Sequence, residues 1–66
     1  MIVMINGEER PIRENVSLQE LVAEFGLKPE TTIVEKNGRI IEKADFASER
    51  IYVGDVIEIV RFVGGG

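Results

Sequence analysis

The chain has 66 residues, enough for one small domain with a single core, so we expect residues 1–66 to fold as one unit. It contains no cysteine and no histidine, which excludes disulfides, thiol chemistry and the usual neutral-pH base and metal ligand. Twelve acidic and eight basic residues give a net charge of −4, whereas nucleic-acid-binding surfaces are basic. With no recognisable signal peptide and no apolar run of roughly 18–20 residues, we expect a cytoplasmic protein that binds no metal, nucleic acid or membrane.

The first predicted element is a β-hairpin. Residues 2–5 are apolar and predict a strand, and Asn6-Gly7 is a strong signal for a two-residue turn, since both central residues of a type I′ turn need a positive φ. The returning strand is expected over residues 8–14. Because Pro11 cannot donate a backbone hydrogen bond, this strand should lie at an edge of the sheet.

A helix with a complete set of end signals follows. Ser17 and Glu20 have the spacing of a capping box, and Val16 before the cap is placed to form a hydrophobic staple with the helix. Gly26, followed by Pro29, marks the end of the helix. Apolar residues at positions i, i+3, i+4 and i+7 predict the face that packs on a sheet; they are Leu18, Leu21, Val22 and Phe25.

The remaining elements are mostly strands. Residues 31–36 predict a third strand, Asn37-Gly38 a second hairpin turn, and residues 39–42 a short fourth strand. Residues 43–50 are mixed, with one short helical turn expected around 44–47, and residues 51–53 indicate a brief extended piece. After the turn Gly54-Asp55, residues 56–63 form the longest predicted strand. The predicted class is α+β, with a mixed sheet of about five strands packed on one helix.

The strands at 2–5 and 56–63 are apolar at nearly every position, although a single helix can cover only one face of a sheet. Alternation along each strand points one set towards the helix: Val3, Ile5, Ile57 and Ile59. A second set points away, together with Glu58: Ile2, Met4, Val60 and Phe62. If the two strands are neighbours, the second set forms an exposed apolar patch, which we interpret as a partner-binding surface. Alternatively, these are ordinary exposed side chains, partly covered by residues 43–50.

The sequence ends in Gly64-Gly65-Gly66, directly after the last apolar strand. Glycine buries no side chain and loses the most backbone freedom on ordering, so we predict a flexible tail. Three extended residues reach roughly 10 Å and have no Cβ to clash, so the tail can enter a narrow tunnel in another protein. We predict that the carboxylate of Gly66 is the reacting group, that Gly64 and Gly65 give it access, and that the catalytic machinery belongs to partners. The alternative is an incidental disordered end.

The order of elements, the Gly54-Asp55 turn and the glycine ending resemble the ubiquitin-like β-grasp superfamily. Within it, the whole chain is similar to the ThiS family of sulfur carriers of thiamin biosynthesis. The resemblance is carried by the length, by the opening strand with its Asn-Gly turn, and by residues 34–38 and 54–60. Its most specific part is the ending, residues 62–66.

This resemblance implies a carrier and not an enzyme. A ThiF-like adenylating enzyme would use ATP to adenylate Gly66, and a sulfur donor such as a cysteine desulfurase would supply the sulfur. The resulting thiocarboxylate would then serve a ThiG-like thiazole synthase. The carrier itself would bind no permanent cofactor. The resemblance also implies that Val60 and Phe62 lie on the face that the activating enzyme grips.

Three other functions stay open on the sequence alone. The chain could carry sulfur for molybdopterin or another pathway, although those carriers are usually longer. It could be a ubiquitin-like modifier whose tail is joined to a target lysine, or a plain binding module. A free-standing enzyme is disfavoured, because neither Asp45 nor Asp55 has an evident partner carboxylate.

Overall fold

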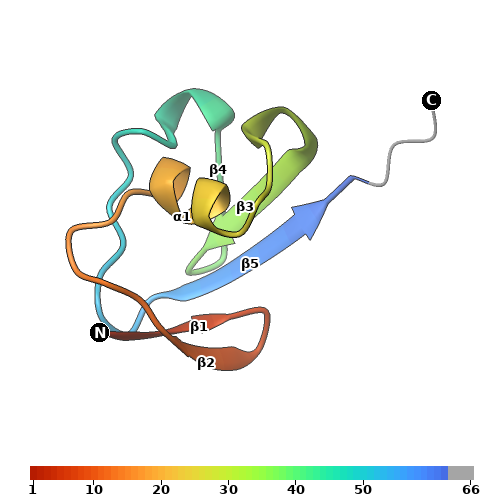
Figure 1. The fold of residues 1–66 in the computed structure, drawn as a ribbon. Helices are drawn as coiled ribbons and strands as arrows, with labels where there is room; N and C mark the ends of the chain where they lie inside the picture. Colours follow the sequence, from red (N-terminus) through yellow and green to blue (C-terminus); the bar gives the residue numbers. More distant parts are fainter. Residues whose placement is uncertain (63–66) are drawn as a thin grey trace.

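The structure is a computed structural model that describes residues 1–62 of the chain. A five-stranded sheet has the order β2-β1-β5-β3-β4 and packs against one helix (Figure 1). Strands β1 and β5 pair in parallel and all other neighbours pair antiparallel, so the sheet is mixed. The elements are β1 (Ile2–Ile5), β2 (Glu8–Pro11), α1 (Leu18–Glu24), η1 (Pro29–Thr31), β3 (Thr32–Lys36), β4 (Arg39–Ile41), η2 (Lys43–Asp45) and β5 (Val56–Arg61). The predicted α+β class and strand number are confirmed.

Both hairpins turn on the predicted Asn-Gly pairs, with positive φ at each asparagine (52° at Asn6 and 53° at Asn37) and at the glycine that follows. The asparagine side chains also bind the central strand β5. Asn6 Oδ1 accepts the N–H of Ile59 at 2.8 Å, and Asn37 Oδ1 accepts the N–H of Val56 at 2.9 Å. Each turn therefore closes a hairpin and also anchors it to β5.

The first turn of α1 has the predicted capping box. The Oγ of Ser17 accepts the N–H of Glu20 at 3.1 Å, and the Glu20 carboxylate accepts the N–H of Ser17 at 3.0 Å. Two of the N–H groups that a helix start leaves without partners are thus satisfied within four residues.

The helix ends at the predicted glycine. Gly26 has φ +73°, and its N–H donates to the carbonyl of Ala23 at 2.9 Å. The N–H of Leu27 donates to the carbonyl of Val22 at 3.0 Å, which completes a Schellman motif. Both ends of the helix therefore follow local sequence signals.

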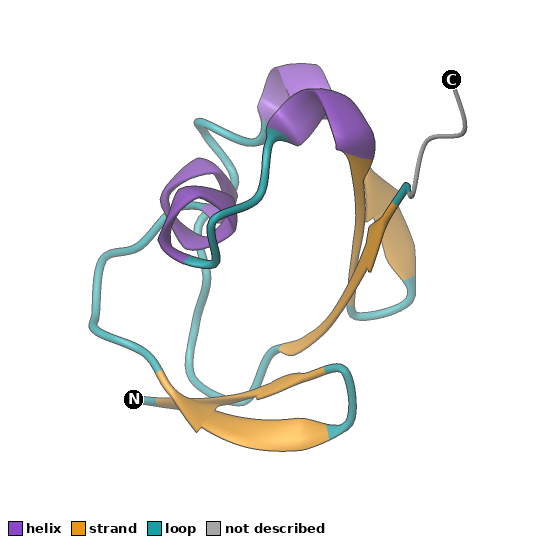
Figure 2. Cartoon of the chain, turned by 45° about the vertical axis from the view of Figure 1, so that its right-hand side comes forward, coloured by secondary structure: helices purple, strands orange, loops and turns teal. Residues whose placement is uncertain are grey.

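The core lies between α1 and the side of the curved sheet that wraps around it (Figure 2). All four strand residues predicted to face the helix are buried there. Phe25 differs from its prediction, because it is only partly buried and its ring lies beneath the Arg10 guanidinium, 5.2 Å from the ring centre. The buried apolar residues are Val3, Ile5, Ile12, Val16, Leu18, Leu21, Val22, Val34, Ile41, Phe46, Ile51, Ile57 and Ile59.

Strand β2 is an edge strand, as its proline predicted, but it ends at Pro11 and not at residue 14. The chain turns inwards at Ile12, whose side chain joins the core and whose N–H donates to the carbonyl of Met1 at 2.7 Å. Asn15 then takes a positive φ of 62°. The burial of one isoleucine therefore shortens the predicted strand.

Residues 51–53, predicted as a brief extended piece, lie outside the strands of the sheet. Ile51 is buried, and its N–H donates to the carbonyl of Val16 at 3.0 Å. We call this extended segment, residues 50–53, the strap. The structure describes β5 as far as Arg61. Residue 63, the predicted end of that strand, lies outside the described residues.

Residues 43–50 lie beside the first turn of α1. The N–H of Leu18 donates to the carbonyl of Glu49 at 2.9 Å, and that of Gln19 to the carbonyl of Phe46 at 3.0 Å. The predicted helical turn is the 3-10 helix η2, which begins one residue early. Because this segment packs on the helix side, the alternative that it covers the other face of the sheet is wrong.

Candidate partner-binding surface

One face of the sheet, which we call the open face, points away from α1 (Figure 2). Strand alternation and the pairing registers assign its side chains. Large apolar residues on it are well exposed, at 57% for Val60 and 56% for Phe62. The open-face residues are Ile2, Met4, Glu9, Pro11, Ile33, Glu35, Ile40, Val56, Glu58, Val60 and Phe62.

The register divides the apolar patch that the sequence predicted. Ile2 and Met4 share the open face with Val60 and Phe62, but Met4 pairs with Val56 at the start of β5. Val60 and Phe62 lie four and six residues further along, roughly 13 and 20 Å away. The prediction of a single patch is therefore wrong, because two parallel strands begin at the same end of the sheet and β1 is short.

A different set of residues surrounds the end of β5. Ile33 of β3 lies directly opposite Val60, and the N–H of Phe62 donates to the carbonyl of Thr31 at 2.8 Å, so strand pairing continues to the last described residue. We call this half of the open face the tail-side surface; it consists of Ile33, Glu35, Ile40, Glu58, Val60 and Phe62. Sequence reasoning missed Ile33, Glu35 and Ile40, because their positions depend on which strand neighbours β5.

Two carboxylates meet on the tail-side surface. Glu35 of β3 is paired directly with Glu58 of β5, an arrangement of like charges that destabilises a sheet. Within residues 1–62, neither side chain has an ion pair or side-chain hydrogen bond. The basic residues of the strands all alternate towards the helix side; they are Arg10, Lys36, Arg39 and Arg61.

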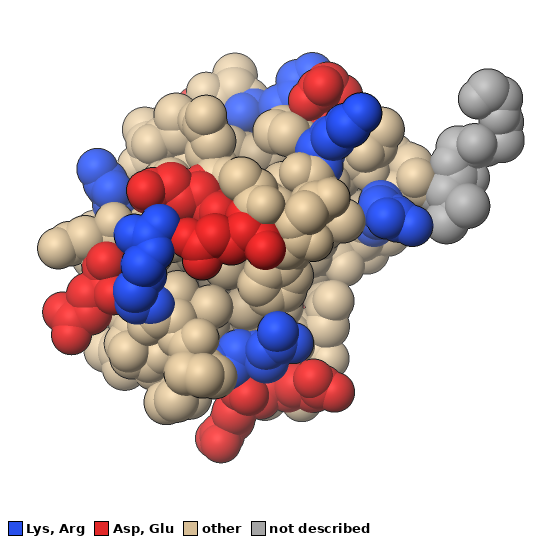
Figure 3. All heavy atoms as spheres, in the orientation of Figure 1, with Lys and Arg blue, Asp and Glu red and all other residues tan. Residues whose placement is uncertain are grey.

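Charges elsewhere are mixed in sign, and several of them form ion pairs. The side of the molecule in Figure 3 shows acidic and basic side chains next to one another. Arg13 lies 2.6 Å from Glu24 and 3.5 Å from Glu20, and these carboxylates raise the Arg13 pKa. Hydrogen bonds from Ser17, with a contribution from Arg13, hold the Glu20 pKa below its usual value. The Glu35–Glu58 pair differs from these groups, because it brings two like charges together without a basic partner.

A nearly buried lysine fixes the segment before β5. The ammonium of Lys36 lies 2.8 Å from the Glu49 carboxylate and 3.6 Å from that of Asp55. It also donates to the carbonyl of Arg50 at 2.7 Å. Strand β3 is thereby tied to the strap at residues 50–53.

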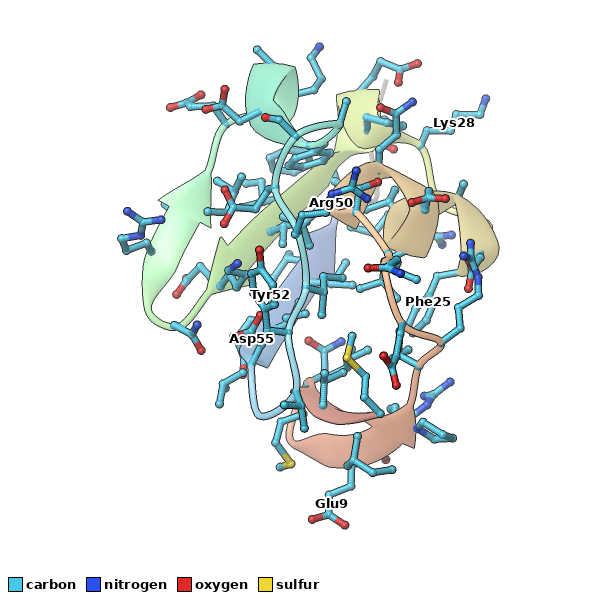
Figure 4. The ribbon with its side chains drawn as sticks, turned by 90° about the vertical axis from the view of Figure 1, so that its left-hand side faces the viewer. Glu9, Phe25, Lys28, Arg50, Tyr52 and Asp55 are labelled. Carbon is cyan, nitrogen blue, oxygen red and sulfur yellow. The ribbon has the colours of Figure 1, made fainter. Side chains whose placement is uncertain are left out.

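Asp55 holds the turn that starts β5. Its carboxylate accepts the side-chain N–H of Asn37 at 3.0 Å and the backbone N–H of Tyr52 at 2.8 Å; Figure 4 shows Tyr52 and Asp55 side by side. Burial acts to raise the Asp55 pKa, but these hydrogen bonds and the charge of Lys36 outweigh it and lower the pKa. The contacts of Asp55 are therefore structural.

A shallow hollow of about 740 Å³ lies away from the tail-side surface, between the N-terminus and the strap. It contains none of the predicted site residues. Its lining consists of Met1, Glu14, Asn15, Arg50, Ile51, Tyr52 and Val53. Residues 1–62 contain no group of three acidic side chains placed to hold a metal ion, and no helix among them is long and apolar enough to cross a bilayer.

Gly64, Gly65 and Gly66 lie outside the described residues, so their predicted roles stay predictions. The matches to known proteins include these three glycines. A family model described as the ThiS family matches residues 3–66. The chain belongs to the ThiS family. Sulfur carrier protein ThiS of Bacillus subtilis is 36% identical to this ThiS-family chain over 66 residues, which cover 98% of the chain and 100% of that protein.

Solved structures of ThiS proteins have the same fold. The crystal structure of the thiamine biosynthesis protein ThiS from Geobacter metallireducens matches with a TM-score of 0.85 at 29% identity, over 100% of both chains. The ubiquitin-like β-grasp fold is thereby confirmed.

Longer relatives also contain this domain. A thiazole synthase of Paramagnetospirillum magneticum is 38% identical over 66 residues, and one of Magnetococcus marinus is 30% identical. Each match covers 100% of this ThiS-family chain but 20% of the synthase. The chain thus spans about one fifth of the length of these relatives.

Proposed function

We propose that this ThiS-family chain is a sulfur carrier of thiamin biosynthesis, folded as one domain over residues 1–66, whose tail presents a reactive carboxylate at Gly66. The observation that carries the proposal is the family match, which continues through the three glycines to residue 66. The end-to-end match to the carrier of Bacillus subtilis supports it.

The first chemical step is adenylation by a partner enzyme. A terminal carboxyl has a pKa of about 3.3–3.7, so it is ionised at neutral pH. One carboxylate oxygen of Gly66 attacks the α-phosphorus of ATP, the bond between the α-phosphorus and the bridging oxygen breaks, and pyrophosphate leaves. The glycyl-adenylate then carries AMP as a leaving group. The chain itself supplies the nucleophile and its access, and the partner supplies ATP binding and catalysis.

Sulfur enters in the second step. The terminal sulfur of a persulfide, made by a sulfur donor such as a cysteine desulfurase, attacks the acyl carbon of Gly66 and displaces AMP. A second thiol breaks the remaining sulfur–sulfur bond and leaves a thiocarboxylate on Gly66. This thiocarboxylate is the form that delivers sulfur to a thiazole synthase.

The pairing with a thiazole synthase is supported by the longer relatives. In two organisms a segment similar to this chain is part of a protein named thiazole synthase. Two activities joined in one polypeptide have a high effective concentration for each other. We propose that a ThiG-like synthase is the partner that receives the sulfur, and that a ThiF-like enzyme performs the adenylation.

The chain contributes a tail and a docking surface. Gly64 and Gly65 give the carboxylate a route into the enzyme, because a backbone without Cβ atoms fits a narrow tunnel. Val60 and Phe62, which are exposed at the end of β5, contact the adenylating enzyme directly before the tail enters. Ile2 and Met4 lie at the other end of the open face, roughly 13 Å or more from Val60, and are not part of this contact.

Replacing Gly65 with valine tests the role of the tail. Gly65→Val should abolish ATP–pyrophosphate exchange by the adenylating enzyme while the melting temperature stays unchanged, because the added side chain blocks the tunnel. Val53→Ala, at an exposed position before β5 begins, is the control and should react normally. Unchanged exchange with Gly65→Val would contradict the tunnel.

Replacing Phe62 with aspartate tests the docking surface. Phe62→Asp should weaken binding to the adenylating enzyme more than it lowers the melting temperature. Tyr52→Asp is a matched control, because Tyr52 is an aromatic residue of similar exposure outside the open face. A collapse in stability with unchanged affinity per folded molecule would show that Phe62 supports the fold and not the partner.

A further inference from the structure

We propose that Glu35 and Glu58 together receive one basic side chain, an arginine or a lysine, at the centre of the partner's apolar contact with the tail-side surface. The inference rests on the proposed function for the identity of the partner, an enzyme that acts on the tail. It adds the chemistry by which such an enzyme recognises this surface.

Strand pairing brings the two glutamates of the pair together. Glu35 and Glu58 are directly opposite on β3 and β5, where Cβ atoms are about 5 Å apart. Like charges on directly opposite residues repel each other in the free chain. A cation placed between them converts the repulsion into two attractive interactions, so the pair favours a bound state over the free state.

Residues 1–62 do not supply this cation. Lys36 follows Glu35 directly but points to the helix side, where it binds Glu49. Arg39 pairs with Lys36 and therefore lies on that side as well. The neighbouring strand residue on the open face is Ile40, opposite Glu35. Within residues 1–62, strand pairing thus places no basic side chain beside the pair on the open face.

Exposed apolar side chains lie next to the pair. Ile33 and Val60 lie two residues away along their strands, at the end where β5 leads to residue 62. On the neighbouring strand β4, Ile40 lies opposite Glu35 and is 67% exposed. A partner that covers these side chains removes water from around the carboxylates. Charge interactions strengthen in a lower dielectric, and a guanidinium can bind two carboxylates through its fork of N–H donors.

The charge also argues against self-association as the occupant. A second copy of the chain would bring the same acidic pair towards this surface and add repulsion. The partner that fits is a protein with an apolar patch and one central basic residue. Because β5 leads from this surface to residue 62, docking there places the partner beside the start of the tail.

Neutral variants of the pair give effects of opposite sign on binding and on stability. Glu58→Gln and Glu35→Gln should each raise the Kd for the adenylating enzyme about tenfold to a hundredfold, as expected for loss of one member of a desolvated charge pair. Each should also raise the melting temperature of the free chain by about 1–4 °C, because the repulsion is removed. Titration calorimetry and thermal unfolding measure the two effects.

Glu9→Gln is the matched control. Glu9 is an open-face glutamate that lies opposite Met4 on β2, away from the pair, and it projects from the molecule in Figure 4. This variant loses the same charge but should change the Kd less than threefold. The ratio of the Kd of Glu58→Gln to that of wild type should fall only slightly at high salt, because a charge pair that the partner covers is weakly screened.

The outcomes separate this inference from the proposed function. If both pair variants bind as tightly as wild type, or if Glu9→Gln weakens binding equally, the proposal that Glu35 and Glu58 bind a basic side chain is overturned. In that case the wild-type chain still acquires sulfur on Gly66 in the presence of both enzymes, and the carrier function stands. If the wild-type chain neither binds the adenylating enzyme nor acquires sulfur, both the carrier function and the role of the glutamate pair are contradicted.

Discussion

The helix side and the open face of the sheet are formed by the same strands, yet their side chains meet different conditions. On β5, Ile57 and Ile59 are buried on the helix side, whereas Val60 and the adjoining Phe62 are more than half exposed. On the helix side Lys36 has carboxylate partners, whereas on the open face Glu35 faces another glutamate. The helix side is therefore organised for stability, and the open face has the features of a surface that binds a partner.

Truncation of one core residue on β5 should produce the largest effect. Ile57→Ala removes a fully buried side chain and should lower the free energy of unfolding by about 2–5 kcal/mol. Val60→Ala, three residues further on the open face, should change it by about 0.5 kcal/mol or less. Denaturant unfolding of both variants measures the contrast, and equal losses would show that the two faces contribute alike.

Loss of the buried lysine should come next. Lys36→Met leaves Glu49 and Asp55 without their cation and the carbonyl of Arg50 without its donor, so the free energy of unfolding should fall by about 1–3 kcal/mol. Lys28→Met is the control, because Lys28 is an exposed lysine that points outwards in Figure 4. If both variants lose the same amount, the network around Lys36 contributes nothing specific.

Removal of the helix cap should have a smaller effect. Ser17→Ala deletes the acceptor for the Glu20 N–H and should cost about 1 kcal/mol, measured by chemical unfolding. Ser48→Ala, at an exposed serine of the loop, should cost less. Stability unchanged in Ser17→Ala would show that packing alone fixes the start of the helix.

The pH dependence of stability should show the smallest effect. The folded-state pKa of Asp55 lies below its usual value, so its contribution is fully present above the unfolded-state pKa of about 3.9. It is lost as the pH falls from there through the folded-state pKa, where the unfolded state binds the proton more readily. Asp55→Asn should flatten this part of the stability curve. An unchanged slope below pH 4 would contradict the role given to Asp55.

Local signals predicted the local structure well. The cap at Ser17, the stop at Gly26 and the two Asn-Gly turns depend on residues within a few positions of each other, and the structure confirms all of them. The family resemblance supplied the fold. Short-range geometry and the glycine ending therefore carried most of the sequence analysis.

Long-range pairing explains what the sequence did not predict. The neighbours of Val60 depend on the register of β3 against β5, so Ile33 and the Glu35–Glu58 pair could not be found from strand alternation alone. The division of the apolar patch likewise follows from the pairing of Met4 with Val56. These features join residues that are far apart along the chain, and no local pattern encodes them.

Intact-protein mass spectrometry can show whether the end of the chain carries sulfur. The protein as isolated from cells is incubated with ATP, magnesium, the adenylating enzyme and a persulfide donor. We expect a mass gain that matches exchange of one oxygen for sulfur, localised to Gly66 by fragmentation. An unchanged mass with an active enzyme, or a mature chain that continues beyond Gly66, would contradict it.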